Sequence, residues 1–345
     1  MGEKKTYNVG IDLALFRNRL EFTAEWYKNT SEDLLYAVPV PEQAGVSNTT
    51  VTMNAASMNN SGFEFSATYR NRDHDFKYEV SANLSTLRNR VTSLGFGTDS
   101  YISGSYITKV GEEIGQFYGW VYEGIARTQE VLDNHATQEG AQIGDCLYKD
   151  VNNDGKVDSE DQVVLGSGMP KINFGLNARF EYKRFDLSIA TFGALNYHVS
   201  DDIYNSLNSC YGWGNKEVGM LDANRFSEDG STYLSNVPRT YVTNSASLGW
   251  NDLFSSRKIQ NAAYWKIANV ELGYNFPDKW FDKYVSDVRF YISAQNLHTF
   301  TGYHGYNVDY AGGTFTPGYN FCSYPTARTF MCGVHLHSNL YLSST

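Results

Sequence analysis

The sequence predicts an all-β chain whose antiparallel strands form part of a transmembrane β-barrel with long extracellular loops. Three observations predict this fold: apolar and polar residues alternate, short and long connections alternate, and aromatic residues stand at strand ends. The composition agrees, because Tyr (26) and Phe (20) are frequent and Pro (7) is scarce. Aromatic residues favour strands, whereas Pro is depleted from them.

About nine segments alternate apolar and polar residues, which places successive side chains on opposite faces of a strand. In residues 76–85, Val80 and Leu84 share one face, whereas Lys77 and Glu79 share the other. Most segments have roughly ten residues, the length that a tilted strand needs to cross a bilayer. The segments are residues 7–16, 19–27, 62–71, 76–85, 171–182, 185–192, 264–276, 287–300 and 328–337.

The connections between these segments alternate in length. Residues 17–18, 72–75, 183–184 and 277–287 are short, whereas residues 30–61, 90–170, 193–263 and 301–327 are long. Outer-membrane barrels have this pattern, with short periplasmic turns and long extracellular loops. If the short turns are periplasmic, the ninth strand runs inward and its end lies in the periplasm.

Aromatic residues stand at the ends of several strands. Amphipathic rings belong at the boundary between bilayer and water, so these residues predict aromatic girdles. The alternative is that Tyr and Phe are good strand residues in any sheet. The residues concerned are Trp26, Tyr27, Tyr69, Tyr182, Tyr264, Trp265, Tyr274 and Phe300.

The charge and the hydropathy pattern exclude several classes of protein. A formal net charge of −10 argues against a nucleic-acid partner, because phosphate binding needs a basic surface. No run of about 18 apolar residues occurs, so no transmembrane helix is predicted. Residues 1–6 enter a strand pattern without the apolar segment of a signal peptide. The barrel interpretation therefore predicts that the chain is a fragment without its front part.

Motifs of common enzymes do not occur in the sequence. There is no G-x-S-x-G elbow, P-loop, HExxH motif or dinucleotide-binding fingerprint after a strand. Glu112 and Glu113 are adjacent and point to opposite sides of an extended chain, so they do not form a glycosidase pair. We therefore predict that the chain is not an enzyme.

The cysteines and histidines lack the spacing of a metal centre. Neither CxxC pairs nor zinc spacings occur, and a Cys210–Cys322 disulfide and four free thiols both remain compatible with the sequence. His335 and His337 share one strand face but have no third ligand, so we interpret them as ordinary lumen-side or periplasmic residues. The cysteines are Cys146, Cys210, Cys322 and Cys332.

Residues 150–161 place oxygen donors at the spacing of a calcium loop. Gly155 is at the sixth position, where such a loop turns sharply, and Lys156 at the seventh would offer its backbone carbonyl. Because Ca²⁺ takes six to eight oxygen ligands, the spacing predicts a structural calcium site. The alternative is an acidic turn held by side-chain hydrogen bonds without an ion. The side-chain donors are Asp150, Asn152, Asp154, Asp158 and Asp161.

Three aromatic residues alternate in another predicted loop: Tyr118, Trp120 and Tyr122. Aromatic faces in an external loop bind sugars or peptides in some proteins, and pack a long loop against its neighbour in others. The sequence leaves both interpretations open.

Six segments match, in order, phrases of one known family. They are 114–125 (IGQFYGWVYEGI), 150–161 (DVNNDGKVDSED), 164–177 (VLGSGMPKINFGLN), 185–188 (FDLS), 291–301 (YISAQNLHTFT) and 324–325 (YP). Together they cover most of the chain, which on these segments resembles the SusC/RagA family of TonB-dependent outer-membrane transporters.

The resemblance implies a barrel around an N-terminal plug that imports oligosaccharides or peptides through the outer membrane. It implies a SusD-like surface lipoprotein as a partner, contact with outer-membrane lipid, and energy from TonB through the missing N-terminal part. Residues 1–338 would be the C-terminal portion of the barrel, without the plug and the earlier strands. Residues 339–345 depart from the family's usual terminal aromatic and are expected to be an atypical tail. The alternative is a secreted, calcium-stapled β-sandwich that acts as a binding or adhesin-like module.

Overall fold

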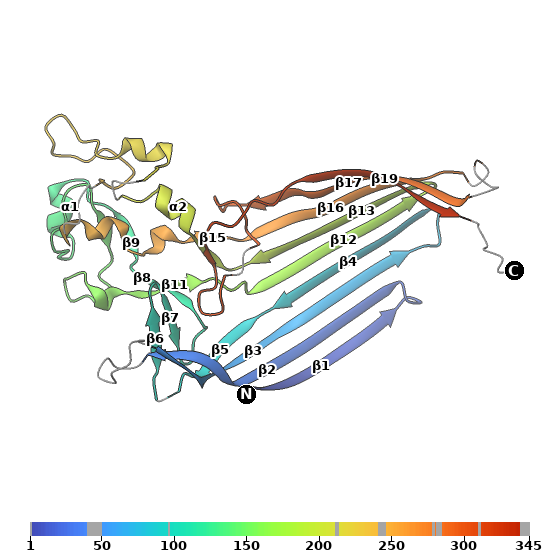
Figure 1. Ribbon diagram of the computed structural model, residues 1–345, viewed down its shortest axis with the longest axis horizontal. Helices are drawn as coiled ribbons and strands as arrows, with labels where there is room; N and C mark the ends of the chain where they lie inside the picture. The colour runs from blue at the N-terminus through green and yellow to red at the C-terminus, as the bar shows by residue number, and fades with distance from the viewer. Residues whose placement is uncertain are drawn as a thin grey trace.

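A computed structural model of the chain shows one long antiparallel sheet with a mass of loops at one end (Figure 1). Nine strands follow one another in the order β1-β2-β3-β4-β12-β13-β16-β17-β19, so the sheet is a meander. This arrangement confirms the predicted fold class, although the strands that the structure describes do not close into a barrel. The structure describes residues 2–39, 50–95, 97–210, 214–240, 246–277, 280, 285–309 and 312–338, and the predicted tail at 339–345 lies outside them.

All nine predicted strands are present in the meander. They are β1 (Glu3–Leu15), β2 (Leu20–Pro39), β3 (Thr50–Asn71), β4 (Phe76–Thr86), β12 (Ile172–Tyr182), β13 (Phe185–Leu195), β16 (Tyr264–Asn275), β17 (Val285–Thr301) and β19 (Thr329–Ser338). The prediction of a loop over residues 30–61 was wrong in part, because β2 and β3 have 20 and 22 residues. About ten residues suffice to cross a bilayer, so the remainder would extend into water, where the apolar alternation is not needed.

The two faces of the sheet differ in chemistry along every strand. Ala24 lies opposite Phe65, Phe65 opposite Leu84, and Leu84 opposite Phe174, so one apolar row crosses four strands. The adjacent row on the other face is polar and contains Thr23, opposite Ser66 on the next strand. We call these two surfaces the apolar face and the polar face.

The apolar face is not covered by a second layer in the described parts of the chain (Figure 1). Phe65 is 38% exposed, Leu176 is 43% exposed and Ile292 is 48% exposed. A β-sandwich would bury such residues between two sheets, so the sandwich alternative is wrong. Among the described strands, β1 pairs with β2 alone and β19 with β17 alone, so both edges of the described sheet present unpaired backbone groups.

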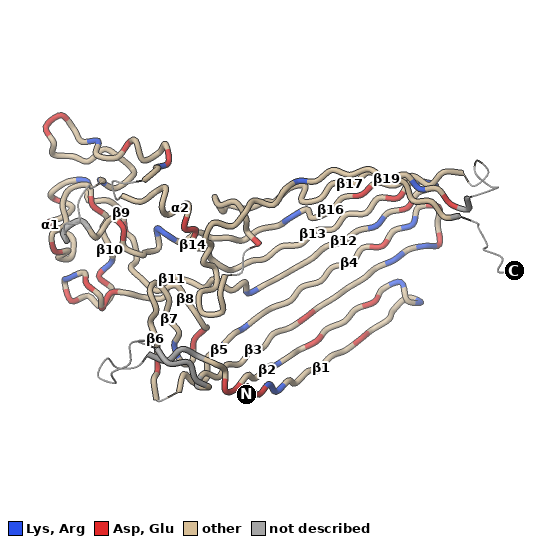
Figure 2. Tube along the Cα trace, in the orientation of Figure 1, with Lys and Arg blue, Asp and Glu red and all other residues tan. Residues whose placement is uncertain are grey.

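Aromatic residues mark both ends of the apolar face. Phe185 and Tyr274 lie 4.9 Å apart near the short turns, and Trp265 and Phe300 lie 5.3 Å apart near the loops, measured between ring centroids. Two residues of the predicted girdles, Tyr27 and Tyr264, are instead on the polar face. Each stands next to an outward-facing tryptophan, Trp26 or Trp265, and successive side chains of a strand alternate between the faces. Figure 2 shows that charged residues gather at the short turns and in the loops.

The loops fold into a region of their own beyond the strand ends opposite the short turns (Figure 1). Among the described residues, no helix is long and apolar enough to cross a membrane. The elements of this region are β5 (Arg88–Ser93), β6 (Ser100–Ser103), β7 (Tyr106–Lys109), β8 (Gln116–Gly119), β9 (Tyr122–Ile125), α1 (Gln129–Asn134), β10 (Cys146–Tyr148), η2 (Ser159–Asp161), β11 (Val163–Ser167), β14 (His198–Asp201), α2 (Asp202–Leu207), η3 (Val218–Asp222), η4 (Ala246–Asp252), η5 (Ser256–Lys258), β15 (Gln260–Asn261) and β18 (Tyr319–Asn320).

Candidate functional site

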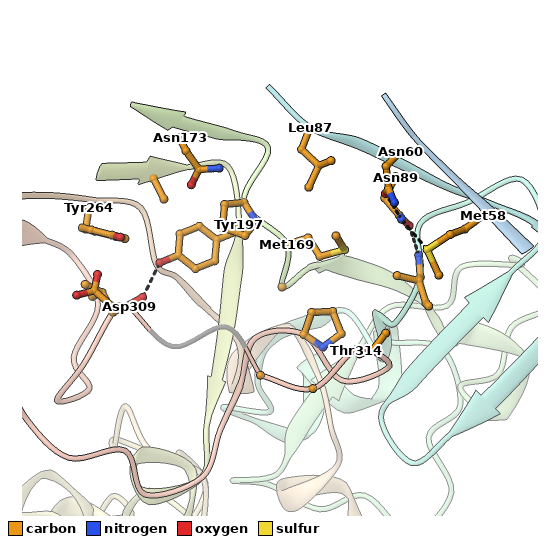
Figure 3. Close-up of a pocket in the computed structure, with 18 of the residues that line it drawn as sticks. Met58, Asn60, Leu87, Asn89, Met169, Asn173, Tyr197, Tyr264, Asp309 and Thr314 are labelled. Carbon is orange, nitrogen blue, oxygen red and sulfur yellow. Dashed lines mark hydrogen bonds between the residues drawn. The ribbon is translucent and has the colours of Figure 1, made fainter. Parts of the chain in front are cut away.

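A cavity of about 710 Å³ lies on the polar face, where the strands of the sheet meet the loops (Figure 3). Strands β3, β12, β13 and β16 form its wall, and the segment between β17 and β19 closes it. Residues from both sides line it: Met58, Asn60, Asn89, Met169, Asn173, Phe192, Tyr197, Tyr264, Val308, Asp309, Thr314 and Pro317. We call it the wall cavity.

Residues 302–309 and 312–327, which we call segment 302–327, fold back across the polar face and are held at several points. The hydroxyl of Tyr197 donates a hydrogen bond to the carbonyl of Val308 at 2.8 Å. The ammonium of Lys266, only 4% exposed, contacts the carboxylate of Asp309 at 2.6 Å. Phe315 packs against a buried apolar cluster that includes Ile114. The segment therefore connects the β16 side of the sheet with the loops above β3.

A buried polar network fixes both ends of this segment. The hydroxyl of Tyr303 donates to the carboxylate of Asp201. The amide of Asn320 donates to the same carboxylate at 3.0 Å and to the Tyr303 hydroxyl at 2.9 Å. The backbone N–H of Ser200 donates to the carbonyl of Gly318 at 2.9 Å. Satisfied networks of this kind rigidify a fold. No local pattern in the sequence predicts this network, because Asp201 and Asn320 are 119 residues apart.

The lining of the wall cavity combines apolar surface with neutral hydrogen-bonding groups. The amide of Asn89 donates to Asn60 at 2.6 Å, and its oxygen accepts from the backbone N–H of Ile114 at 2.9 Å. The Asp309 carboxylate also lines the cavity, and its charge is neutralised by the ion pair with Lys266. Apolar walls with a few placed polar groups are typical of ligand sites, so the cavity suits a neutral ligand with both kinds of surface.

The acidic loop, residues 150–161, is organised by its own carboxylates. The Asp150 carboxylate accepts hydrogen bonds from the backbone N–H groups of Asn153, Asp154 and Gly155 at 2.7, 3.3 and 2.8 Å. Gly155 has a φ of +85°, a conformation that L side chains rarely adopt. The side chain of Asn152 also accepts, from the N–H of Asp154 at 2.9 Å. The turn thus has the conformation that the calcium interpretation expects at its sixth position.

Asp161 has a different role from the other acidic residues of this loop. Its buried carboxylate accepts from the backbone N–H groups of Val151, Asn152 and Asp158 at 2.8, 3.3 and 2.9 Å. Burial raises the pKa of Asp161, but these three donors outweigh burial and hold its pKa below the ordinary value. Asp161 therefore stabilises the loop by accepting backbone hydrogen bonds on its buried side. In the described residues, no three His, Cys, Asp or Glu side chains converge as metal ligands, so an ion here would also need Asn152 and backbone oxygens.

The three alternating aromatic residues lie in different environments. Tyr122 packs beside the buried Tyr148, with ring centroids 6.4 Å apart. Tyr118 is half-buried in β8, opposite Val164 of β11. Trp120 packs against the same cluster as Tyr122 and also lines a groove on the outside of the loops, together with Trp250. Sequence reasoning missed Trp250, because it stands 130 residues from Trp120 on an element without regular alternation.

The cysteines and histidines form no metal centre in the parts of the chain that the structure describes. Cys210 is buried, Cys322 is exposed, and neither carries a disulfide. His335 lies on the polar face, where its ring stacks on Tyr291 with centroids 4.9 Å apart.

Sequence comparison identifies relatives among the TonB-dependent receptors. The chain is 30% identical to TonB-dependent receptor P3 of Formosa agariphila over 96% of this chain and 34% of that protein. It is 25% identical to TonB-dependent receptor SusC of Bacteroides thetaiotaomicron over 96% of this chain and 31% of that protein. The chain is homologous to TonB-dependent receptors of the SusC type. It spans about a third of the length of these relatives, and no family model matches the sequence.

The fold comparison agrees with this homology. The structure of the RagAB peptide transporter superposes with a TM-score of 0.78 at 22% identity, over 96% of this chain and 35% of that chain. The RagAB peptide importer in its closed-closed state superposes with a TM-score of 0.76. The SusC/RagA resemblance is thereby confirmed. Receptors of this type are outer-membrane proteins, which confirms the predicted location.

Proposed function

We propose that this chain forms the C-terminal wall and outer loops of a TonB-dependent importer of oligosaccharides or peptides. A SusD-like surface lipoprotein would be its partner. The observation that carries the proposal is the meander with one uninterrupted apolar face and one polar face. Lipid would cover the apolar face, and the polar face would line the lumen. This role is transport and requires no catalytic residue of the chain.

The relatives support the choice of cargo only at the level of class. RagAB is described as a peptide transporter, and SusC as a TonB-dependent receptor. The wall cavity lies on the proposed lumen side, and its apolar and amide lining suits a sugar or a peptide equally well. We propose that cargo passes this cavity on its way through the barrel.

The experiment that tests the proposal is fractionation of the native cells with an antibody against residues 90–160. We expect a band in the outer membrane that is much heavier than the 38.9 kDa of this chain. Deletion of the gene should then abolish uptake of fluorescently labelled oligosaccharides or peptides from a panel of both classes. A water-soluble band near 38.9 kDa, or unchanged uptake of every compound in the panel, would overturn the proposal.

We further propose that residues 150–161 bind Ca²⁺ as a structural ion. The support is the spacing of the donors Asp150, Asn152, Asp154 and Asp158, and the positive φ of Gly155. Terbium is a suitable probe, because the Trp120 indole donates to the Asp158 carbonyl at 2.9 Å and would sensitise terbium emission.

The terbium signal should appear with the intact receptor and be displaced by calcium. Asp150→Ala together with Asp154→Ala should abolish it. Asp229→Asn is the matched control, since Asp229 also accepts backbone and hydroxyl hydrogen bonds in an acidic turn, outside this loop. At a calcium concentration of about 100 times Kd, the ion would stabilise the loop by about 2.7 kcal/mol. Equal terbium emission from the double variant would contradict the site.

A further inference from the structure

A groove of about 550 Å³ lies on the loop region, separate from the wall cavity. Its walls come from four stretches of chain: residue 120 between β8 and β9, residues 139–140, residues 158–159 of the acidic loop, and residues 249–253 in and after η4. Trp120, Trp250 and Leu253 provide apolar surface, and Glu139, Asp158 and Ser159 provide polar groups. We call it the tryptophan groove.

Both indoles in the groove are fixed by their only hydrogen-bond donor. The Trp120 Nε1–H donates to the carbonyl of Asp158 at 2.9 Å, and the Trp250 Nε1–H donates to the carbonyl of Glu139 at 2.8 Å. Each ring is thus tied to a backbone group of another segment of the groove wall. Because the indole nitrogen has no second donor, a ligand can use only the ring surfaces. The backbone of Trp120 is also held, by a hydrogen bond from its N–H to the carbonyl of Phe254 at 3.2 Å.

The polar side chains of the groove are mainly hydrogen-bond acceptors. Two carboxylates, from Glu139 and Asp158, and one hydroxyl, from Ser159, line it, and no basic or amide side chain is among the described lining residues. The Asp158 carboxylate accepts from the backbone N–H of Glu160 at 2.8 Å and from that of Asp161 in a capping box, so it is engaged within the acidic loop. The exposed Glu139 carboxylate is therefore the main acceptor that the groove offers a ligand. The ligand must therefore donate hydrogen bonds, present an apolar surface to the rings, and carry no negative charge.

A neutral sugar ring satisfies these three requirements. Its C–H groups form an apolar face that packs on an aromatic ring, and its hydroxyls at the rim donate to carboxylates. We propose that the tryptophan groove binds a neutral oligosaccharide and rejects sulfated or uronic sugars by charge repulsion. This inference goes beyond the proposed transport, because binding on the outer loops does not require passage through the lumen.

The test is a titration of the purified intact receptor in detergent with maltohexaose, cellohexaose and xylohexaose, followed by calorimetry. At least one of these sugars should bind, whereas hexagalacturonate should not. Trp250→Ala should weaken binding by at least about tenfold, the size of effect typical of one aromatic stacking contact. Trp280→Ala is the matched control, since Trp280 is exposed and lies at the short-turn end of the sheet, and it should leave binding unchanged.

A second variant separates binding from folding, because Trp250 also packs against the buried Tyr148. Glu139 has an exposed side chain, so Glu139→Gln should weaken binding several-fold while the melting temperature stays the same. Two results would overturn the proposal: no neutral hexasaccharide binds, or both variants bind like the native receptor. A third is that tetramethylammonium binds and the sugars do not, because aromatic rings beside carboxylates would then form a cation site. Loss of uptake with intact sugar binding would instead count against the proposed transport alone.

Discussion

The sheet and the loop region of this molecule are stabilised in different ways. The sheet is one layer thick, and large apolar residues such as Leu176 and Ile292 are exposed on its apolar face. The loop region buries its own apolar clusters, and Phe117 and Tyr148 are almost inaccessible there. The sheet therefore depends on lipid for the burial of its apolar surface, whereas the loops are packed like the interior of a soluble protein.

Charged groups show the same contrast. On the polar face, Arg70 and Glu21 form an ion pair that remains partly exposed. In the loops, the Asp145 carboxylate is 0% exposed and accepts from Arg239 at 3.0 Å and from Asn251 at 2.8 Å. Buried charges are tolerated only with a complete set of partners. The stability of the loop region therefore depends on its buried polar groups, whereas loss of an exposed ion pair on the sheet should have little effect.

The largest effect should follow removal of that buried carboxylate. Asp145→Ala leaves the guanidinium of Arg239 without its partner inside the loop region. We expect a loss of about 3–5 kcal/mol in the local stability of the loops, as for other broken buried ion pairs. Hydrogen exchange of residues 90–170 in the intact receptor measures this loss.

The matched control for this variant is Asp222→Ala. Asp222 pairs with Arg225 at 3.2 Å, but both side chains are exposed. Protection of the loops should stay close to that of the native receptor. If the two variants had equal effects, burial would not distinguish the two ion pairs.

The next effect concerns the apolar face of the sheet. Leu176 is in the middle of β12, where Leu176→Arg would place a charge against lipid at a cost of about 2–4 kcal/mol. Phe65→Arg and Val80→Lys should act in the same way. We expect loss of assembly into the outer membrane, measured as the heat-modifiable fraction on a gel.

The neighbouring residue on the other face provides the control for this variant. Asn177→Arg adds the same charge one residue later, on the polar face, and should assemble normally. Equal assembly of both variants would contradict the assignment of the two faces.

Alternation predicted the sheet well because each strand has apolar residues on the face toward lipid and polar residues on the face toward water. The register that joins Ala24, Phe65 and Leu84 into one row follows directly from this contrast. The outer parts of β2 and β3 were missed, because residues that extend into water do not need to alternate. Strands without an apolar face leave no periodic signal in a sequence.

The loop contacts were not predictable in the same way. Asp145 meets Arg239 and Asn251 across 94 and 106 residues, and nothing local in the sequence marks these three as partners. The acidic loop was predicted because its oxygen donors lie within twelve consecutive positions at a specific spacing. Only one of the two tryptophans of the groove was predicted as a binding residue. Trp120 belongs to the alternating aromatic residues of its loop, whereas Trp250 belongs to no periodic pattern.

A smaller effect should appear on acidification of the acidic loop. Because the pKa of Asp161 is depressed in the folded state, its contribution to stability is complete above the unfolded value of about 3.9. The contribution is lost as pH falls through the lower, folded pKa. We therefore expect no change in the fluorescence of the native receptor from neutral pH down to about pH 4, and a change below it.

Asp161→Asn should remove this pH dependence and cost about 1–3 kcal/mol at neutral pH, since three backbone donors lose a charged acceptor. Glu160→Gln is the control, because this neighbouring side chain is exposed, and it should behave like the native receptor. An unchanged acid transition in Asp161→Asn would show that other groups cause it.

The smallest effect should come from an ion pair on the polar face. Arg72 contacts Glu79 at 3.0 Å, and the two side chains are 70% and 37% exposed. Arg72→Ala should lower the stability of the receptor by less than about 1 kcal/mol, measured by urea unfolding in lipid vesicles. Glu79 also keeps a second partner, because Arg70 contacts it at 3.4 Å. Exposure and this second partner both make the expected loss smaller than for the buried Arg239–Asp145 pair. A loss above about 2 kcal/mol for Arg72→Ala would mean that a further part of the receptor covers this end of the polar face, and the contrast between wall and loops would then hold only for the isolated chain.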